Sequence, residues 1–191
     1  MSSVTIIGTG SMATAIGGVL AGGGSTVTYL GHGTPGTIDG DIVVLAIPYP
    51  AVADVLATYG AQLAGKVVVD ITNPLDFATF DSLVVPAGSS AAAEIAAALP
   101  DSHVLKAFNT TFAGTLSTGT VGGTVPTTVL VAGDDADAKA ALVAAVEAGG
   151  LKALDAGSLA RAHELEAIGF LQLTLAVSEK IGWTGGFALA K

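Results

Sequence analysis

The sequence predicts an α/β fold with a doubly wound, mainly parallel sheet, and three observations support this prediction. Apolar, β-branched runs alternate with Ala-rich stretches along most of the 191 residues, as expected when helices follow parallel strands. The run 42–47 is apolar throughout, as is typical of a strand covered on both faces. The run 4–7 passes through a glycine turn directly into the Ala-rich stretch 13–21. A chain of this length buries about 70% of its unfolded surface, which is enough for one domain.

The glycine turn comprises six residues: Gly8, Thr9, Gly10, Ser11, Met12 and Ala13. Gly8 permits a sharp turn, Gly10 lets the backbone approach a pyrophosphate, and Ala13 is small enough for close helix–strand packing. The helix that follows directs its free N–H groups and positive dipole end at the phosphates. This strand–turn–helix context predicts a Rossmann-type dinucleotide site. The alternative is a Gly-rich turn without a ligand.

The second predicted strand, residues 25–30, ends without the acidic residue that holds the ribose hydroxyls of NAD in such folds. It continues into Gly31, His32, Gly33 and Thr34. A carboxylate would repel a 2′-phosphate and these residues would not, so we predict NADP(H) as the cofactor, with His32 and Thr34 as candidate phosphate contacts. The alternative for His32 is a solvated turn residue, since no basic cluster surrounds it.

The connection to the third strand, residues 34–40, is too short for the usual crossover helix with its loops. We expect that helix to be missing and the adenosine edge of the site to be open. The later strands are predicted at residues 41–47, 66–71, 103–108, 127–133 and 151–154. Later helices are predicted at residues 51–59, 91–99, 136–148 and 156–180, and loops at 76–85 and 115–126. Residues 1–155 are expected to form the dinucleotide-binding domain, and 156–191 a dimerisation appendage of that domain.

In doubly wound sheets, ligands bind beyond the carboxyl ends of the strands. Cofactor contacts are therefore expected from the glycine turn, from residues 31–34, and from Ala46, Ile47, Pro48 and Asn73. A second substrate is expected against Tyr49, Asn73, Pro74, Phe108, Asn109 and Thr110. The asparagines have an alternative role, because amides on turns also cap the backbone.

Few residues are candidates for acid–base, nucleophilic or metal chemistry. The chain has no Cys, no Gly-x-Ser-x-Gly and no His-x-x-x-His, so no catalytic residue and no metal site are predicted. We expect His103 and His163 to be solvated or capping residues and the Lys106 stem to pack beside the sheet. Hydride transfer to a flavin-like or other small acceptor fits, because it needs alignment more than an acid or base.

Two alternatives to that reaction stay open. Reduction of a small carbonyl or imine is favoured if His103, Lys106 or Tyr49 faces the nicotinamide. A cofactor-binding module without turnover would also explain the few acid–base candidates.

Charge and composition restrict the partners. A net charge of −9 argues against nucleic acid and anionic membranes as partners. There is no membrane-spanning apolar run and no basic leader, and the absence of Cys fits a cytoplasmic protein. The apolar stretch 168–173 indicates self-association.

Four segments resemble the F420-dependent NADP reductases and related dinucleotide-binding enzymes, and the resemblance spans nearly the whole chain. These segments are the turn 8–13, Ala46-Ile47-Pro48, Asp70-Ile71-Thr72-Asn73-Pro74-Leu75 and Lys106-Ala107-Phe108-Asn109-Thr110. The resemblance implies NADP(H), a deazaflavin (F420) or flavin co-substrate stacked on the nicotinamide between the strand-end turns, and a homodimer through C-terminal helices. Gly31-His32 stands where the family has a Ser-Arg or similar phosphate-binding pair.

Overall fold

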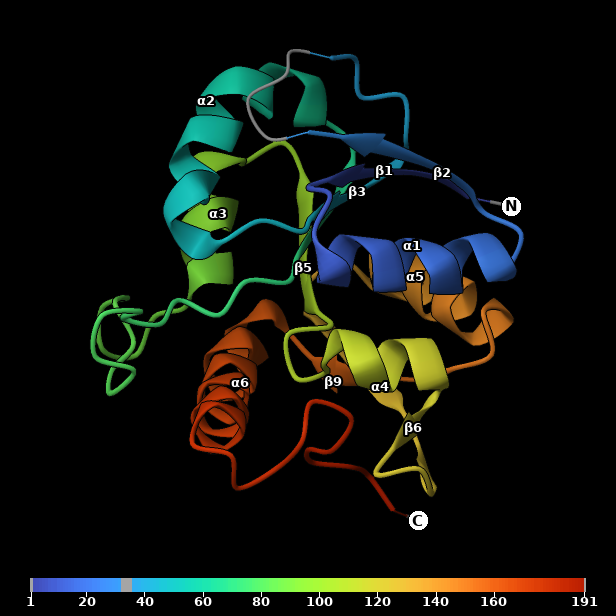
Figure 1. Ribbon diagram of the computed structural model, residues 1–191. Helices are drawn as coiled ribbons and strands as arrows, with labels where there is room; N and C mark the ends of the chain where they lie inside the picture. Colours follow the sequence, from blue (N-terminus) through green and yellow to red (C-terminus); the bar gives the residue numbers. More distant parts are fainter. Residues whose placement is uncertain (1, 32–35, 191) are drawn as a thin grey trace.

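The computed structural model describes residues 2–31 and 36–190. The strands of the main sheet are β1 (Ser3–Ile7), β2 (Thr26–Leu30), β3 (Ile42–Leu45), β4 (Val67–Asp70), β5 (His103–Ala107), β8 (Thr128–Gly133) and β9 (Lys152–Gly157). Their order is β2-β1-β3-β4-β5-β8-β9, which confirms the predicted doubly wound fold (Figure 1). Within the described residues, neighbouring strands of this main sheet are parallel except for β5 and β8.

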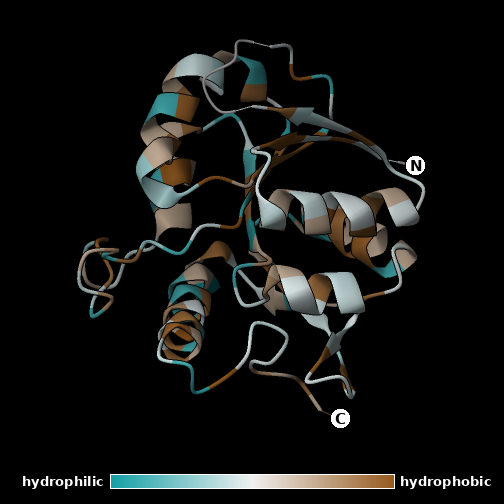
Figure 2. Ribbon diagram, viewed as in Figure 1, coloured by the Kyte–Doolittle hydropathy of each residue, from teal (hydrophilic) through white to brown (hydrophobic). Residues whose placement is uncertain are grey.

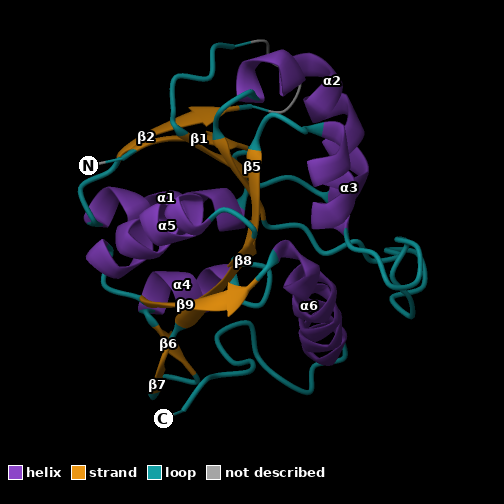
Figure 3. Cartoon of the chain, turned by 180° about the vertical axis from the view of Figure 1, so that it is seen from behind, coloured by secondary structure: helices purple, strands orange, loops and turns teal. Residues whose placement is uncertain are grey.

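Two helical layers enclose this sheet. The helices are α1 (Ser11–Gly22), α2 (Val52–Leu63), α3 (Ala91–Ala98), α4 (Ala113–Thr118), α5 (Ala136–Ala148) and α6 (Ala162–Val177), with 3₁₀ turns η1 (Tyr49–Ala51) and η2 (Leu159–Arg161). The helices α1 and α5 lie on one face and α2 and α3 on the other (Figures 1 and 3). Hydrophobic positions recur in the central strands (Figure 2). The core is therefore divided by the sheet, with Ile6 on one side and Leu45 on the other.

The sequence placed a loop over residues 115–126, and that prediction was wrong. The segment instead contains most of α4 and the hairpin of β6 (Thr120–Val121) and β7 (Val125–Pro126). The Thr115 hydroxyl accepts from the Phe112 N–H at 3.1 Å and donates to the Phe112 carbonyl at 2.9 Å. Leu116 is buried, and α4 packs against α1. Tertiary packing stabilises this helix despite a Gly- and Thr-rich sequence that disfavours it.

The connection between β2 and β3 is short. Its described residues, 31 and 36–41, contain no helix, in line with the expected loss of the crossover helix. The Gly40 N–H donates to the Thr5 hydroxyl at 3.0 Å, so the connection lies directly against β1. His32, Gly33 and Thr34, proposed as phosphate contacts, lie outside the described residues.

The C-terminal helix begins later than predicted, because β9 extends to Gly157 and η2 precedes α6. It lies against α3, and the ion pair of its Glu166 with Lys106 joins it to β5. Every helix in the described part of the chain falls short of the length and hydrophobicity needed to cross a membrane.

Candidate active site

A cavity of about 610 Å³ lies at the carboxyl ends of β1, β3, β4 and β5. The strand-end turns contribute residues 10–12, 46–49 and 71–73, together with Asn109 and Thr111. Three peripheral segments complete the wall: Phe77 from the loop after β4, Phe112 to Gly114 at the start of α4, and Leu173 and Trp183 from α6 and the tail that follows. The turns predicted to meet beyond the sheet therefore surround one cavity.

The glycine turn has the geometry that a dinucleotide site requires. Gly8 has a φ of +127°, and a Cβ there would lie 2.1 Å from the Ala46 carbonyl oxygen. A Cβ at Gly10 would meet nothing within 4 Å, which leaves open space above the turn. Gly10 is the N-cap of α1, whose first turn has no acidic residue. An anion could therefore approach the helix N-terminus at this point without repulsion from that turn.

A second cavity adjoins the first on the outer side of this turn. It has a volume of about 550 Å³ and is lined by Thr9, Gly10, Ser11, Thr14 and other residues of α1 and α4. Gly10 and Ser11 line both cavities. The two cavities thus meet at the helix N-terminus.

Asn73 and Asn109 join the ends of β4 and β5. The Asn109 amide nitrogen donates to Asn73 Oδ1 at 2.9 Å and to the Leu165 carbonyl at 2.8 Å. The Asn73 amide nitrogen donates to the Asn109 carbonyl at 3.0 Å. On α6, a Cβ at Gly169 would lie 2.3 Å from Asn73 Oδ1, so the absence of a side chain there allows α6 to approach the pair. The backbone-capping role of the asparagines is therefore present in the structure.

Two oxygen atoms on the cavity-lining residues have hydrogen-bonding capacity to spare. Among residues 2–31 and 36–190, Thr72 Oγ1 and Asn109 Oδ1 are buried without a hydrogen-bond partner. Both residues line the larger cavity. Because buried polar groups are normally satisfied, this pair indicates where a ligand could supply the missing donor and acceptor.

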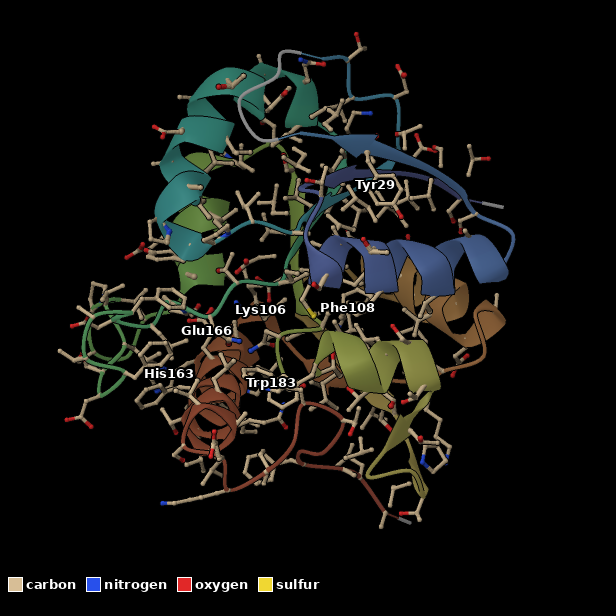
Figure 4. All side chains as sticks on the ribbon, viewed as in Figure 1. Tyr29, Lys106, Phe108, His163, Glu166 and Trp183 are labelled. Atoms are coloured by element: carbon tan, nitrogen blue, oxygen red, sulfur yellow. The ribbon has the colours of Figure 1, made fainter. Side chains whose placement is uncertain are left out.

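A buried ionic cluster joins β4, β5 and α6 next to the cavity. Lys106 and Glu166 of this cluster are labelled in Figure 4. Lys106 Nζ lies 2.8 Å from Asp70 Oδ2 and 2.8 Å from Glu166 Oε1, and all three side chains are at most 1% exposed. Lys106 also donates to the Thr72 carbonyl oxygen. The cluster therefore fixes the backbone of the turn that carries Asn73. The expectation for Lys106 needs correction, because its ammonium group is enclosed by carboxylates and its stem does not simply pack beside the sheet.

Glu166 extends the cluster to α3. It accepts hydrogen bonds from the Ala91 and Ala92 N–H groups at 3.0 and 3.3 Å. Burial raises the pKa of Glu166, although Lys106 and the N–H group of Ala91 act in the opposite direction. The side chain thus ties α6 to the N-terminus of α3 and to β5.

Comparison with known proteins assigns the chain to a family. A family described as "NADP oxidoreductase coenzyme F420-dependent" matches residues 34–74. The F420-dependent NADP reductase of Methanocaldococcus jannaschii is 31% identical over 151 residues, which cover 77% of this chain and 67% of that protein. The chain belongs to the F420-dependent NADP reductase family. It is accordingly an NAD(P)-dependent oxidoreductase.

Two further proteins are similar to the chain, one in fold and one in part of its sequence. A solved structure from Arthrobacter sp. FB24, described as a putative F420-dependent NADP reductase, superimposes with a TM-score of 0.84 at 24% identity and full coverage of both chains. The rat metalloreductase STEAP3 is 37% identical over 113 residues, 59% of this chain and 22% of that protein. The fold shared with the first extends over the full length of both chains.

Most of the residues predicted for the reductase site line one of the two cavities. They are Thr9, Gly10, Ser11, Met12, Ala46, Ile47, Pro48, Tyr49, Asn73 and Asn109. Gly8 and Ala13 are the buried ends of the turn and line neither cavity. Gly31 lines neither cavity and follows Leu30, whose carbonyl accepts a hydrogen bond from the Gly8 N–H at 2.8 Å. Pro74, Phe108 and Thr110 are buried and do not line the cavity. Phe108 is fully buried in the core, so its side chain supports the turn from below.

The sequence analysis gave no site role to Phe77, Phe112, Glu166 and Trp183, and it included Thr72 only as part of the strand-end segment 70–75. Only Thr72 carried a sequence signal, since it adjoins Asn73 at a strand end. The two histidines lie away from the cavity: His103 pairs with Asp135 at 2.9 Å, and His163 Nδ1 contacts the Ser89 carbonyl at 3.0 Å. No cluster of the described residues could hold a metal ion.

Proposed function

We propose that this reductase transfers a hydride between NADP(H) and a flavin-like acceptor, deazaflavin F420 or a flavin, or another small acceptor. The observation that carries the proposal is the single cavity shared by the glycine turn and the ends of β3, β4 and β5. It can hold two ring systems in contact, since its volume is about 610 Å³ and ligand pockets typically measure about 300–1,000 Å³.

The residues around the cavity fit a nicotinamide nucleotide. The pyrophosphate would lie over Gly10, where no Cβ blocks it. Thr72 and Asn109, which line the cavity and each carry an unpartnered oxygen atom, would hold the polar carboxamide of the nicotinamide. When bound, NADPH supplies the hydride from its nicotinamide ring. The chain's own task is to hold the ring in a fixed orientation and to exclude water.

The preference for NADP over NAD is supported by the lack of an acidic residue where β2 ends, at Leu30 and Gly31. His32 and Thr34 remain proposed phosphate contacts on sequence grounds. The name of the M. jannaschii relative, which mentions both NADP and F420, supports the same pair of substrates here.

A nucleotide-binding titration and a turnover assay together test the proposal. We expect NADPH to bind with a dissociation constant at least about tenfold below that of NADH, the effect of one charge-assisted contact to the 2′-phosphate. NADPH should then be oxidised with one molecule of F420 or riboflavin reduced per nucleotide. Tighter binding of NADH, or no oxidation with any acceptor, would contradict the proposal.

Reduction of a small carbonyl or imine is a second candidate, because Tyr49 lines the cavity. Its hydroxyl donates to a Glu94 carboxylate oxygen. Burial and this carboxylate raise the pKa of Tyr49 far above its usual value, which makes the phenol a poor proton donor. This reaction would require Tyr49→Phe to abolish turnover of a carbonyl or imine. A module without turnover is disfavoured by membership of a reductase family.

We further propose a cytoplasmic homodimer in which residues 156–191 form the appendage between subunits. The outer face of α6 exposes Ile168 and Leu171, 37% and 51% accessible, and hydrophobic positions recur along this helix (Figure 2). Leu171→Glu should shift the protein from dimer to monomer in sedimentation equilibrium. The matched control is Val84→Glu, on an equally exposed apolar side chain outside α6. A monomeric wild type would contradict the proposal.

A further inference from the structure

The segment after α6 folds back onto the cavity and is held there by a buried amide. Gln172 is 2% exposed. Its Oε1 accepts from the Phe187 N–H at 2.8 Å and its Nε2 donates to the Thr110 carbonyl at 3.2 Å. The Gly122 N–H of the β6–β7 hairpin donates to the Thr184 carbonyl at 2.8 Å. The segment 182–187 is thus anchored directly after Trp183, at Thr184 and at Phe187.

Close approach of this segment depends on a glycine in α4. A Cβ at Gly114 would lie 2.7 Å from the Trp183 carbonyl oxygen. The Trp183 ring packs against Phe112, with ring centroids 5.0 Å apart and planes inclined by 60°. Figure 4 shows the indole in the space between α6 and α4. Backbone and ring are therefore both positioned by contacts with α4.

These contacts nevertheless cover only part of the indole surface. Trp183 is 54% exposed and lines the larger cavity. Phe77, which lines the same cavity from the loop after β4, is 52% exposed. A large, partly exposed aromatic surface on a mainly apolar cavity wall is suited to a flat conjugated ring, because such rings stack on one another in offset or edge-to-face geometry.

We infer that Trp183 is a specificity-determining residue, which forms a stacking wall for the acceptor and selects planar conjugated heterocycles over small carbonyl compounds. The inference rests on the proposed function and names its acceptor class. The nucleotide is bound by the glycine turn and strand ends, whereas Trp183 belongs to a separate segment. Its removal should therefore weaken acceptor binding and leave nucleotide binding intact.

The experiment compares three variants with the wild type, using riboflavin and F420 as acceptors. We expect Trp183→Ala to raise KM for both acceptors about tenfold, as loss of one aromatic stacking contact predicts, with NADPH affinity unchanged. Trp183→Phe keeps an aromatic face and should retain most of the acceptor affinity. The control Phe187→Ala changes another exposed aromatic residue in the same segment, outside the cavity wall, and should behave as wild type.

A binding measurement accompanies the kinetics. Trp183 is the only tryptophan in the chain, so riboflavin should quench the intrinsic tryptophan fluorescence of the wild type, with a dissociation constant that follows KM. Absence of quenching, or equal KM in Trp183→Ala and Phe187→Ala, would overturn the inference. A parallel loss of NADPH affinity in Trp183→Ala would do so too, since it would reveal a general defect. Failure of the wild type to bind NADPH would instead refute the proposed function, and the riboflavin titration would still decide the role of Trp183.

Discussion

Lys106→Met is expected to lower the free energy of unfolding by about 3–5 kcal/mol, because it leaves two buried carboxylates without their shared cation. Asp70 and Glu166 each lie 2.8 Å from the ammonium nitrogen, and at most 1% of either side chain is exposed. Methionine fills a similar volume, so the loss reflects charge more than a cavity. Chemical denaturation measures the effect. The control Lys152→Met changes an exposed lysine on β9 and should stay within about 0.5 kcal/mol of the wild type.

The destabilisation should also depend on pH. The pKa of Glu166 is already raised from 4.5 by burial, and the lysine acts to lower it, so the substitution raises it further. A carboxylate with a raised folded-state pKa contributes stability that is full below its unfolded pKa and lost as pH rises through the folded pKa. The loss of unfolding free energy caused by Lys106→Met should therefore be larger at about pH 8 than at about pH 5. An equal deficit at both values would contradict this account.

Other carboxylates do not obscure this difference. The pKa values of Asp76, Asp135 and Asp155 are lowered from 3.8 by local hydrogen bonds. Their contribution to stability is lost only as pH falls below about 3.8, outside the range compared here. These carboxylates affect the wild type and the variant alike. The difference in unfolding free energy between the two proteins therefore reports on the ionic cluster alone.

The strand-end turns could be predicted from the sequence because their signals are local. The turn at Gly8 to Ala13 needs only a strand before it and a helix after it. Asn73 and Asn109 follow apolar runs, and parallel strands bring such positions to one edge of the sheet. The same reasoning fails for α4, where Thr115 and Leu116 are stabilised by contacts with distant parts of the chain.

The supporting residues could not be predicted, because their partners are remote in sequence. Glu166 accepts hydrogen bonds from Ala91 and Ala92, 75 and 74 positions away. Trp183 meets Phe112 only because the segment after α6 reverses toward the cavity. Local composition made Glu166 resemble a solvated helix residue. Its role depends on the topology that places α6 against the ends of β4 and β5.

A pair of glycine substitutions separates folding from cofactor binding. Gly8→Ala should lower the free energy of unfolding by more than about 3 kcal/mol, because strain at a positive φ adds to a backbone clash. The added Cβ would lie 2.1 Å from the Ala46 carbonyl oxygen and 2.9 Å from its carbon, at a φ of +127°. Both neighbours are backbone atoms of β3's end, so no side chain can move to relieve the contact.

Gly10→Ala, two residues away, should weaken NADPH binding and leave stability nearly unchanged. Its Cβ meets nothing within 4 Å, so stability should stay within about 1 kcal/mol of the wild type. The methyl group would occupy the approach to the N-terminus of α1, and NADPH affinity should fall at least about tenfold. Denaturation curves and NADPH fluorescence titrations measure the two properties separately. Wild-type affinity in Gly10→Ala would mean that the diphosphate does not lie over this turn, whereas a stable Gly8→Ala would mean that the turn is looser than its geometry implies.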